Sequence, residues 1–174
     1  RAHFAADCVA VGHTRDDQAE TFLLRLLRGA GPRGLASMHP RNGDVIRPLL
    51  DCRRPDLAAY LDERGIAHIE DLTNHDVSIP RNRVRAELIP FLKARFNPNV
   101  VDVLADQADL ARQDWLWMED ELKRSNVETG PLESGAWMLD LAALRQAPVA
   151  LRRLAVWKAM TAAARPRPVS FEHV

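Results

Sequence analysis

The sequence has little of what would mark a membrane, secreted or zinc-bound protein. Only two of its 174 residues are cysteines, and Cys8 and Cys52 form neither a CxxC motif nor a zinc-ligand spacing. No run reaches the roughly 18 apolar residues that a membrane helix needs, and the start RAHFAADC does not have the pattern of a signal peptide. These absences predict a cytoplasmic protein that does not contact a membrane. Cys8 lies in an apolar run and is expected to be a buried structural thiol.

The chain also lacks an excess of charge of either sign. It has 24 Lys and Arg against 24 Asp and Glu, so no overall basic field indicates nucleic-acid binding. Basic residues are nevertheless concentrated over residues 81–95, where Glu87 is the only acid among Arg81, Arg83, Arg85, Lys93 and Arg95. A polyanion, if one is bound, is expected to meet the chain there.

Apolar periodicity predicts an α/β arrangement at the start of the chain. Residues 7–12 have the pattern of a short buried strand in a parallel sheet. The next helix can be capped by Thr14 or Asp16 and can end at Gly29. Its apolar residues recur at helical spacing: Ala19, Phe22, Leu23, Leu26 and Leu27. A strand directly before a helix N-terminus is the arrangement in which α/β proteins bind ligands at the carboxyl end of the strand.

The remaining pattern predicts two domains. A short strand or extended segment is expected over residues 45–50, and a helix from about Pro55 to Gly65 with Tyr60 facing inward. A further helix is expected over 81–95, bent or interrupted at Pro90, and a break containing Gly, Pro and Ser over 125–135. We place a boundary at Asn97-Pro98, and expect helices over about 99–124 and 148–164 beyond it. The fold class predicted is α/β, a partial Rossmann-like domain with a parallel sheet over residues 1–97, followed by an all-α helical domain over residues 98–174. The abrupt ends of the chain predict a piece of a longer protein.

Carboxylates gather where the first helix starts. Asp17 and Glu20 lie less than one turn apart, opposite the apolar stripe, and can together bind an ammonium group or Mg²⁺. The helix dipole favours their ionised forms, which suits them to gripping a cation better than to proton transfer at neutral pH. His13 directly follows Gly12 and is expected to project into the same crevice. The alternatives are that Asp16 only caps the helix, that Asp17 and Glu20 are solvated, and that His13 is structural.

Together these residues resemble a known family. GHTRDDQAETFLLRLLRGAGPRGLASM is similar to the signature of the tRNA(Ile)-lysidine synthases, members of the pyrophosphate-loop ATPase (N-type ATP pyrophosphatase) superfamily. The blocks IRPLLDCRR, IAHIEDLTNHD and PRNRVRAELIPFL follow in the family's order, so the resemblance spans nearly all of residues 1–96. The superfamily's SGGxDS phosphate loop, which lies upstream of this signature, is absent. The resemblance therefore implies that the chain begins after that loop and does not turn over substrate by itself.

The resemblance also implies a reaction and its participants. ATP adenylates the C2 oxygen of the wobble cytidine in a tRNA(Ile) with a CAU anticodon. The amine of free L-lysine then displaces AMP and gives lysidine. The cofactors implied are ATP and Mg²⁺, and a homodimer is the candidate assembly.

Matching the motifs residue by residue assigns expected roles. Asp17 and Glu20 would hold the lysine ammonium, with Asp17 as the candidate ligand of Mg²⁺, and Arg85 would join them as a catalytic residue. His13 would lie near the nucleotide or the target base. The residues expected to contact tRNA are Arg81, Arg85 and Arg28. Arg25, Arg28 and Arg33 have the alternative of being ordinary surface charges.

Two other functions stay open at this point. Another pyrophosphate-loop tRNA-modifying enzyme, such as a thiolase, would commonly carry paired cysteines, and the isolated Cys8 and Cys52 argue against it. A non-catalytic helical RNA-binding module would account for the missing phosphate loop, but the neutral net charge argues against that hypothesis.

Overall fold

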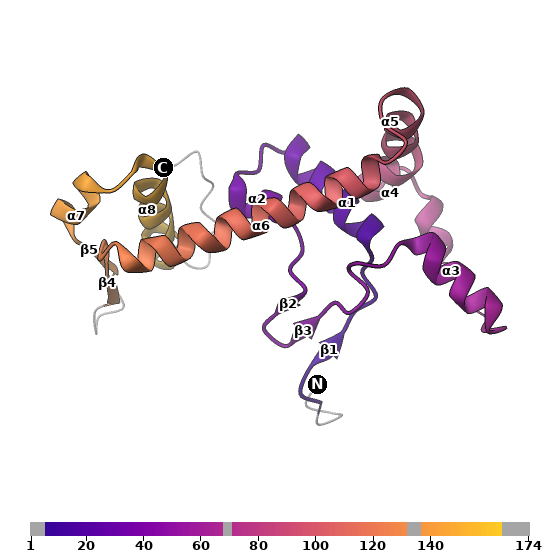
Figure 1. Cartoon of the computed structure of the whole chain (residues 1–174), viewed down its shortest axis with the longest axis horizontal. Helices are drawn as coiled ribbons and strands as arrows, with labels where there is room; N and C mark the ends of the chain where they lie inside the picture. Colours follow the sequence, from indigo (N-terminus) through magenta and orange to yellow (C-terminus); the bar gives the residue numbers. More distant parts are fainter. Residues whose placement is uncertain (1–5, 68–70, 132–136, 165–174) are drawn as a thin grey trace. The chain divides into compact units, whose positions relative to one another are not determined.

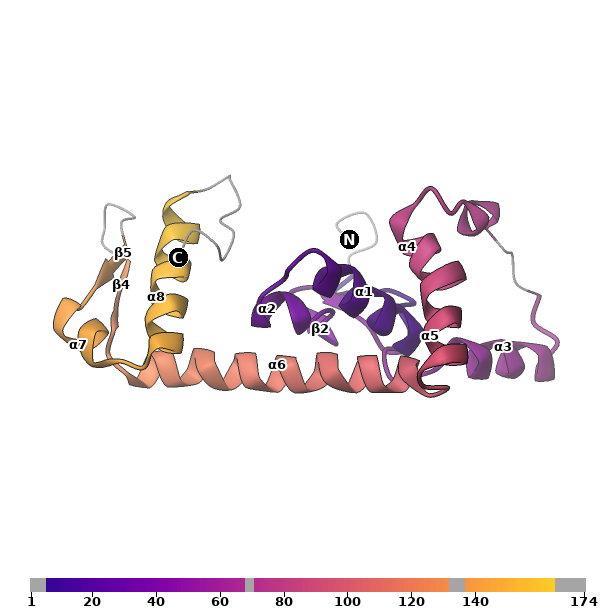
Figure 2. The same cartoon turned by 90° about the horizontal axis from the view of Figure 1, so that it is seen from above.

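The computed structural model describes residues 6–67, 71–131 and 137–164. It divides into two compact units, Arg1–Gln113 and Asp114–Val174, whose elements are labelled in Figures 1 and 2. The limit between these units lies inside a helix. The domain boundary that we place at Asn97-Pro98 separates two sequence domains rather than two compact units, and it stays a prediction.

The first unit contains a small mixed sheet instead of the predicted parallel one. Its strands are β1 (Val9–Ala10), β2 (Arg41–Asn42) and β3 (Val45–Ile46), in the order β1-β3-β2. β1 runs parallel to β3, with Val9 opposite Val45, whereas β2 is antiparallel to β3. The antiparallel pair follows from the tight connection between β2 and β3, in which Gly43 takes a φ of +58°.

The burial predicted for the first strand is wrong. Val9 is 43% exposed, and the thiol of Cys8 is exposed rather than buried. β1 pairs with a single neighbour over only two residues, so the described elements leave its side chains open. The apolar run therefore predicted the position of the strand correctly, but it did not predict that the side chains of the strand are exposed.

Helix α1 (Arg15–Leu27) follows the sheet and carries the acids. Thr14, not Asp16, caps it through a capping box, in which the Thr14 hydroxyl accepts from the Asp17 amide and the Asp17 carboxylate accepts from the Thr14 amide. Of the predicted apolar stripe, Ala19, Phe22 and Leu23 are buried, but Leu26 and Leu27 are exposed. The packed part of the helix is thus its first three turns.

Removing the cap has a defined cost. Thr14→Ala is expected to lower the free energy of unfolding by about 1 kcal/mol, because the Asp17 amide loses its acceptor and the Asp17 carboxylate loses one of its donors. Thr21→Ala is the matched control. Its hydroxyl donates only to the backbone carbonyl of Asp17, and alanine favours a helix interior. Chemical unfolding of both variants measures the difference, and equal stabilities would contradict the assigned cap.

A helical segment interrupted by a π turn packs against α1. It consists of α4 (Pro80–Arg83), the π turn η3 (Val84–Leu88) and α5 (Ile89–Arg95). The sequence predicted a bend or interruption at Pro90. The π turn instead ends two residues before Pro90, which lies in the first turn of α5, where a missing amide hydrogen is tolerated. The core of the first unit joins this segment to α1 and to the first turns of α6 through buried residues: Ala19, Leu23, Val84, Ile89 and Val101.

Three short elements complete the first unit: α2 (Pro32–Leu35), α3 (Arg54–Glu63) and the 3-10 helix η2 (Leu72–His75). The helix predicted between Pro55 and Gly65 is confirmed as α3. Tyr60 does not face inward as predicted, since it is 49% exposed and no residue of α3 is fully buried. Arg64 instead covers the Tyr60 ring at 4.8 Å.

The second unit is not all helical. Helix α6 (Val100–Arg124) is followed by strands β4 (Glu128–Pro131) and β5 (Trp137–Leu139), which form an antiparallel hairpin, and then by α7 (Leu141–Gln146) and α8 (Val149–Ala163). Asn126, with a φ of 55°, turns the chain out of α6 and into the hairpin. The break predicted over residues 125–135 thus contains β4.

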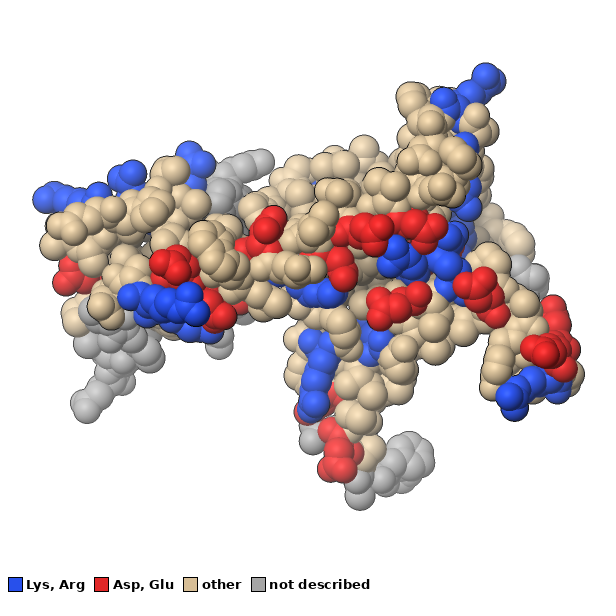
Figure 3. Space-filling model, viewed as in Figure 1, with Lys and Arg blue, Asp and Glu red and all other residues tan. Residues whose placement is uncertain are grey.

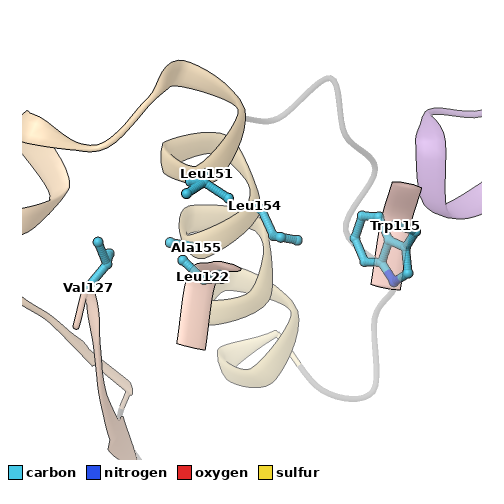
Figure 4. Packing of buried hydrophobic residues seen from close by; sticks show 6 residues of the cluster. All are labelled: Trp115, Leu122, Val127, Leu151, Leu154 and Ala155. Atoms are coloured by element: carbon cyan, nitrogen blue, oxygen red, sulfur yellow. The ribbon is translucent and has the colours of Figure 1, made fainter. Parts of the chain in front are cut away.

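A separate apolar core holds the second unit together (Figure 4). Leu122 and Leu154 are fully buried in it, and Trp115 meets Trp157 edge to face with ring centroids 5.9 Å apart. The other buried members are Val127, Leu151 and Ala155. Val127 and the packed Leu139 belong to the hairpin region, so the hairpin contributes to this core.

Candidate active site

The two predicted acids of α1 lie in a cluster of arginines. Asp17 is 9% exposed and Glu20 only 1%. The polar face of α1 is therefore as buried as its apolar face, which excludes the alternative that these acids are solvated. Guanidinium groups from α3 and from the α4–η3 segment cover them: Arg54, Arg81 and Arg85.

Glu20 binds all three arginines. Arg85 grips it with two bonds, from Nε to Oε1 at 2.7 Å and from Nη2 to Oε2 at 3.0 Å. Arg81 donates from Nε to Oε2 at 2.9 Å, and Arg54 donates from Nη2 to Oε1 at 3.3 Å. A carboxylate this deeply buried needs such partners, because an unpaired buried charge is costly.

Asp17 divides its two oxygens between the helix cap and the arginines. Oδ2 accepts from the amide of Thr14 at 2.8 Å and from its hydroxyl at 2.7 Å. Oδ1 accepts from Arg54 at 3.0 Å, from Arg81 at 3.1 Å and from Arg85 at 3.4 Å. Asp17 thereby fixes the start of α1 and orients the same guanidinium groups that bind Glu20.

These donors keep Asp17 ionised. Burial opposes the charge of Asp17, but the bonds from Thr14 and the nearby arginines outweigh it and hold the pKa of Asp17 below its ordinary 3.8. Burial is likewise outweighed at Asp16, where Arg53 and the amide of Arg54 lower the pKa. Because the folded pKa values lie below the unfolded ones, this stabilisation is present above pH 3.8 and is lost as the pH falls below it.

A second set of ion pairs extends the cluster within the first unit. Arg53 bridges Asp16 and Asp102, with its Nη1 2.7 Å from Asp102 Oδ2. Arg15 donates to Asp102 at 2.8 Å and to Asp106 at 2.6 Å. Figure 3 shows the acidic and basic side chains meeting along the first half of α6. Among the residues that the structure describes, this network balances five arginines against five acids: Arg15, Arg53, Arg54, Arg81, Arg85, Asp16, Asp17, Glu20, Asp102 and Asp106.

His13 lies beside this cluster as a neutral ring. Its Nδ1 accepts a hydrogen bond from Arg47 Nε at 3.2 Å. Burial lowers the pKa of His13 below 6.5, the charges of Arg47 and Arg81 lower it further, and Asp17 acts in the opposite direction. The ring therefore offers its remaining nitrogen as a hydrogen-bond donor at neutral pH.

The predicted tRNA contacts fall into two groups. Arg81 and Arg85 point into the acid cluster, with about a third of each side chain exposed (33% and 29%). Arg28 is exposed and lies at the end of α1. Arg25, in contrast, is not an ordinary surface charge, because it donates to the carbonyls of Gly34 and Ser37 and holds the α2 loop against α1.

The part of the chain that carries the acid cluster matches a known protein family. The family model described as PP-loop domain matches residues 2–92, which is more than half of the chain. The chain belongs to the PP-loop domain family. The three-stranded sheet, α1 and the arginine-bearing α4–η3 segment all fall within the matched part of this PP-loop chain.

The PP-loop chain is similar to curated proteins named tRNA(Ile)-lysidine synthase. It is 42% identical to the one from Geobacter sulfurreducens over 97% of this chain and 36% of that protein. It is 39% identical to the one from Solibacter usitatus over 97% of this chain and 39% of that protein. It is 37% identical to the one from Thermobifida fusca over 97% of this chain and 52% of that protein. The chain thus spans about a third to a half of the length of these relatives.

Three arginines that form ion pairs in the PP-loop chain were not among the predicted site residues. Arg54 binds both predicted acids, and Arg15 and Arg53 connect α1 to Asp102. Two of them could have been predicted from the sequence, because Arg53 and Arg54 end the block IRPLLDCRR, one of the motifs on which the resemblance rests. Arg15 gave no signal, since its partners stand 87 and 91 positions further along the chain.

The described residues of the PP-loop chain do not gather metal ligands. Within residues 6–67, 71–131 and 137–164, no three His, Cys, Asp or Glu side chains are placed to hold a metal ion together. Both oxygens of Asp17 already accept bonds from Thr14 or from arginines, which does not fit a ligand of Mg²⁺. Across the same residues, no helix combines the length and apolar character needed to cross a membrane.

The state of His13 can be measured directly. We expect NMR titration of the PP-loop chain to place the pKa of His13 below 6.5, and Arg47→Met to move it upward, because a neighbouring positive charge is removed. Since the unfolded chain takes up this proton first, stability should decline as the pH falls from 6.5 toward the folded pKa. Arg41→Met, a change at an exposed arginine of β2, is the control. A pKa of 6.5 or above would contradict this environment.

Proposed function

We propose that the full-length protein containing this chain synthesises lysidine. The substrates are ATP, free L-lysine and a tRNA(Ile) with a CAU anticodon, and the products are lysidine-containing tRNA, AMP and pyrophosphate. Adenylation at the C2 oxygen releases pyrophosphate. The lysine amine then forms the new bond to C2 as the C2–oxygen bond breaks and AMP leaves. The buried Asp17–Glu20 pair among three arginines carries this proposal, and the similarity to the lysidine synthases supports it.

The cluster suits the binding of a cationic substrate. Asp17 and Glu20 together face three guanidinium groups, and Arg54 makes the longest of the bonds to Glu20, 3.3 Å, while its side chain is 40% exposed. We propose that the lysine ammonium takes the place of the Arg54 guanidinium, so that the acids keep balanced charge. The freed Arg54 would then be available to an anionic group of the tRNA or nucleotide.

Arg85 and Arg81 would contact the bound tRNA. Their guanidinium groups are held in place by Glu20, yet each keeps about a third of its side chain exposed. A fixed and partly exposed cation stabilises negative charge that develops during a displacement, without first having to reorganise. His13, a neutral donor next to the cluster, would orient the nucleotide or the target base.

The cofactors and the assembly follow in part from the family. A PP-loop domain implies ATP as the nucleotide. Mg²⁺ would neutralise the triphosphate when bound. Both oxygens of Asp17, the ligand predicted from the sequence, are engaged by Thr14 and arginines, so we assign no residue of this chain to the ion. The homodimer and the cytoplasmic location stay predictions.

The proposal is tested with the full-length protein, ATP, labelled lysine and a tRNA(Ile) transcript bearing the CAU anticodon. Mass spectrometry of the nucleosides should detect lysidine, with AMP released in equal amount. A transcript with uridine at the wobble position should remain unmodified. Absence of AMP release with lysine and tRNA present would refute the function, and sulfur in the modified nucleoside would identify a thiolase instead.

A further inference from the structure

A groove lies along the α4–η3 segment, which also carries two arginines of the acid cluster. It has a volume of 690 Å³ and runs between the end of α1 and the α4–η3–α5 segment. Leu24 and Leu27 of α1 line one wall, and Leu88 and Phe91 line the other. The same segment therefore contributes to both the acid cluster and the groove, because Arg81 and Arg85 bind Glu20 while Arg83 lines the groove.

The charges around this groove are free, unlike those in the cluster. Arg28 and Arg83 line it, and among the described residues neither forms a salt bridge. Of the described residues that line the groove, Glu87 is the only acid. Lys93 and Arg95 follow on α5, and on the face shown in Figure 3 basic rather than acidic side chains are visible over α5. The surplus of positive charge favours an anionic occupant over a neutral protein helix.

An aromatic ring is exposed beside these cations. Phe91 is 53% exposed at the groove, and its ring touches Phe96 edge to face with centroids 5.7 Å apart. Aromatic rings flanked by arginines bind unpaired nucleotides, because any base can stack on the ring while the guanidinium groups meet the phosphates. An apolar wall alone would not select RNA, but the ring and the free arginines together do.

We propose that this groove binds an unpaired nucleotide of the anticodon loop, next to the one that is modified. Its base stacks on Phe91, and its flanking phosphates contact Arg28 and Arg83. The inference rests on the proposed function and adds a place for the loop outside the acid cluster. It makes Phe91, Arg28 and Arg83 determinants of RNA binding.

The test uses the full-length protein and two RNA probes, an anticodon stem-loop of the tRNA(Ile) and a blunt duplex of the same length. Phe91→Leu keeps an apolar side chain but removes the ring, so affinity for the stem-loop should fall about tenfold while affinity for the duplex is unchanged. Arg28→Gln and Arg83→Gln should each reduce the slope of log K against log salt by about 0.7. Arg64→Gln, an exposed arginine at the end of α3, is the control for charge, and thermal unfolding confirms that each variant folds.

The outcomes separate this inference from the proposed function. If the wild type makes lysidine and the three groove variants bind the stem-loop as tightly as it does, the groove proposal is wrong and the function stands. Equal losses on stem-loop and duplex would also overturn it, because stacking of an unpaired base would not explain them. If Phe91→Leu instead abolishes self-association in light scattering and leaves RNA binding intact, the groove is a protein interface. A wild type that neither binds nor modifies the tRNA removes both proposals.

Discussion

Replacing Glu20 by glutamine is expected to lower the free energy of unfolding by about 3 kcal/mol or more. The side chain keeps its size, but it loses the charge that three arginines share. Glu20 is 1% exposed and binds Arg54, Arg81 and Arg85 within 3.3 Å. The variant would leave these three guanidinium groups with Asp17 as their remaining carboxylate, and one positive charge of the balanced network would be uncompensated. Urea unfolding of wild type and variant measures the change.

Glu121→Gln is the matched control for this prediction. Glu121 also pairs with an arginine, Arg124 at 3.5 Å, but on an exposed helix surface. Such a pair contributes about 0 to 1 kcal/mol, so the control should unfold nearly as the wild type does. If Glu20→Gln is as stable as Glu121→Gln, the arginines do not depend on Glu20 for their place.

Arg85→Gln is expected to reduce lysidine formation by the full-length protein by about 100-fold or more, mainly in kcat. Arg85 is the arginine that grips Glu20 through two bonds, so its loss removes a positioned cation and loosens the acid. Arg85→Lys restores the charge but cannot make both bonds in the plane of the carboxylate. We therefore expect lysine to recover only part of the rate. Single-turnover kinetics with saturating tRNA separate kcat from binding.

Arg153→Gln provides the control for the loss of one arginine. Arg153 is exposed on α8, outside the cluster, so this variant should keep the wild-type rate. Thermal unfolding of Arg85→Gln distinguishes a catalytic effect from a loss of fold. A variant that folds and retains the wild-type kcat would show that Arg85 serves only to hold Glu20.

Local signals in the sequence predicted the helices well. The capping residue Thr14, the proline near the start of α3 and the long apolar stripe of α6 each depend on neighbours within a few positions. These are the interactions that a linear sequence displays directly. The acids Asp17 and Glu20 were found for the same reason, since both stand in the first turns of one helix.

Surroundings contributed by distant residues could not be predicted in the same way. The sequence showed that Glu20 was polar but not that Arg81 and Arg85, more than 60 positions away, would bury it. Cys8 had apolar neighbours in sequence, yet the sheet leaves it exposed. The β4–β5 hairpin was missed because glycine and proline in its first strand, ETGP, indicate a break. The burial of a side chain depends on which distant residues pack against it, and local sequence patterns do not specify those residues.

The π turn η3 has a consequence for how this family could change by insertion and deletion. A π turn holds one residue more than an α-helical turn, and each residue of a helix rotates the chain by about 100°. Deleting a single residue from Val84–Leu88 would turn the helix regular, and would swing Arg81 and Arg83 around its axis relative to α5. Arg81 would leave Glu20, and the groove would lose Arg83 in the same event. The length of this turn is therefore constrained as well as the identity of Arg85 and Val84, so a one-residue deletion should do more harm than a substitution at an exposed position such as Ala86.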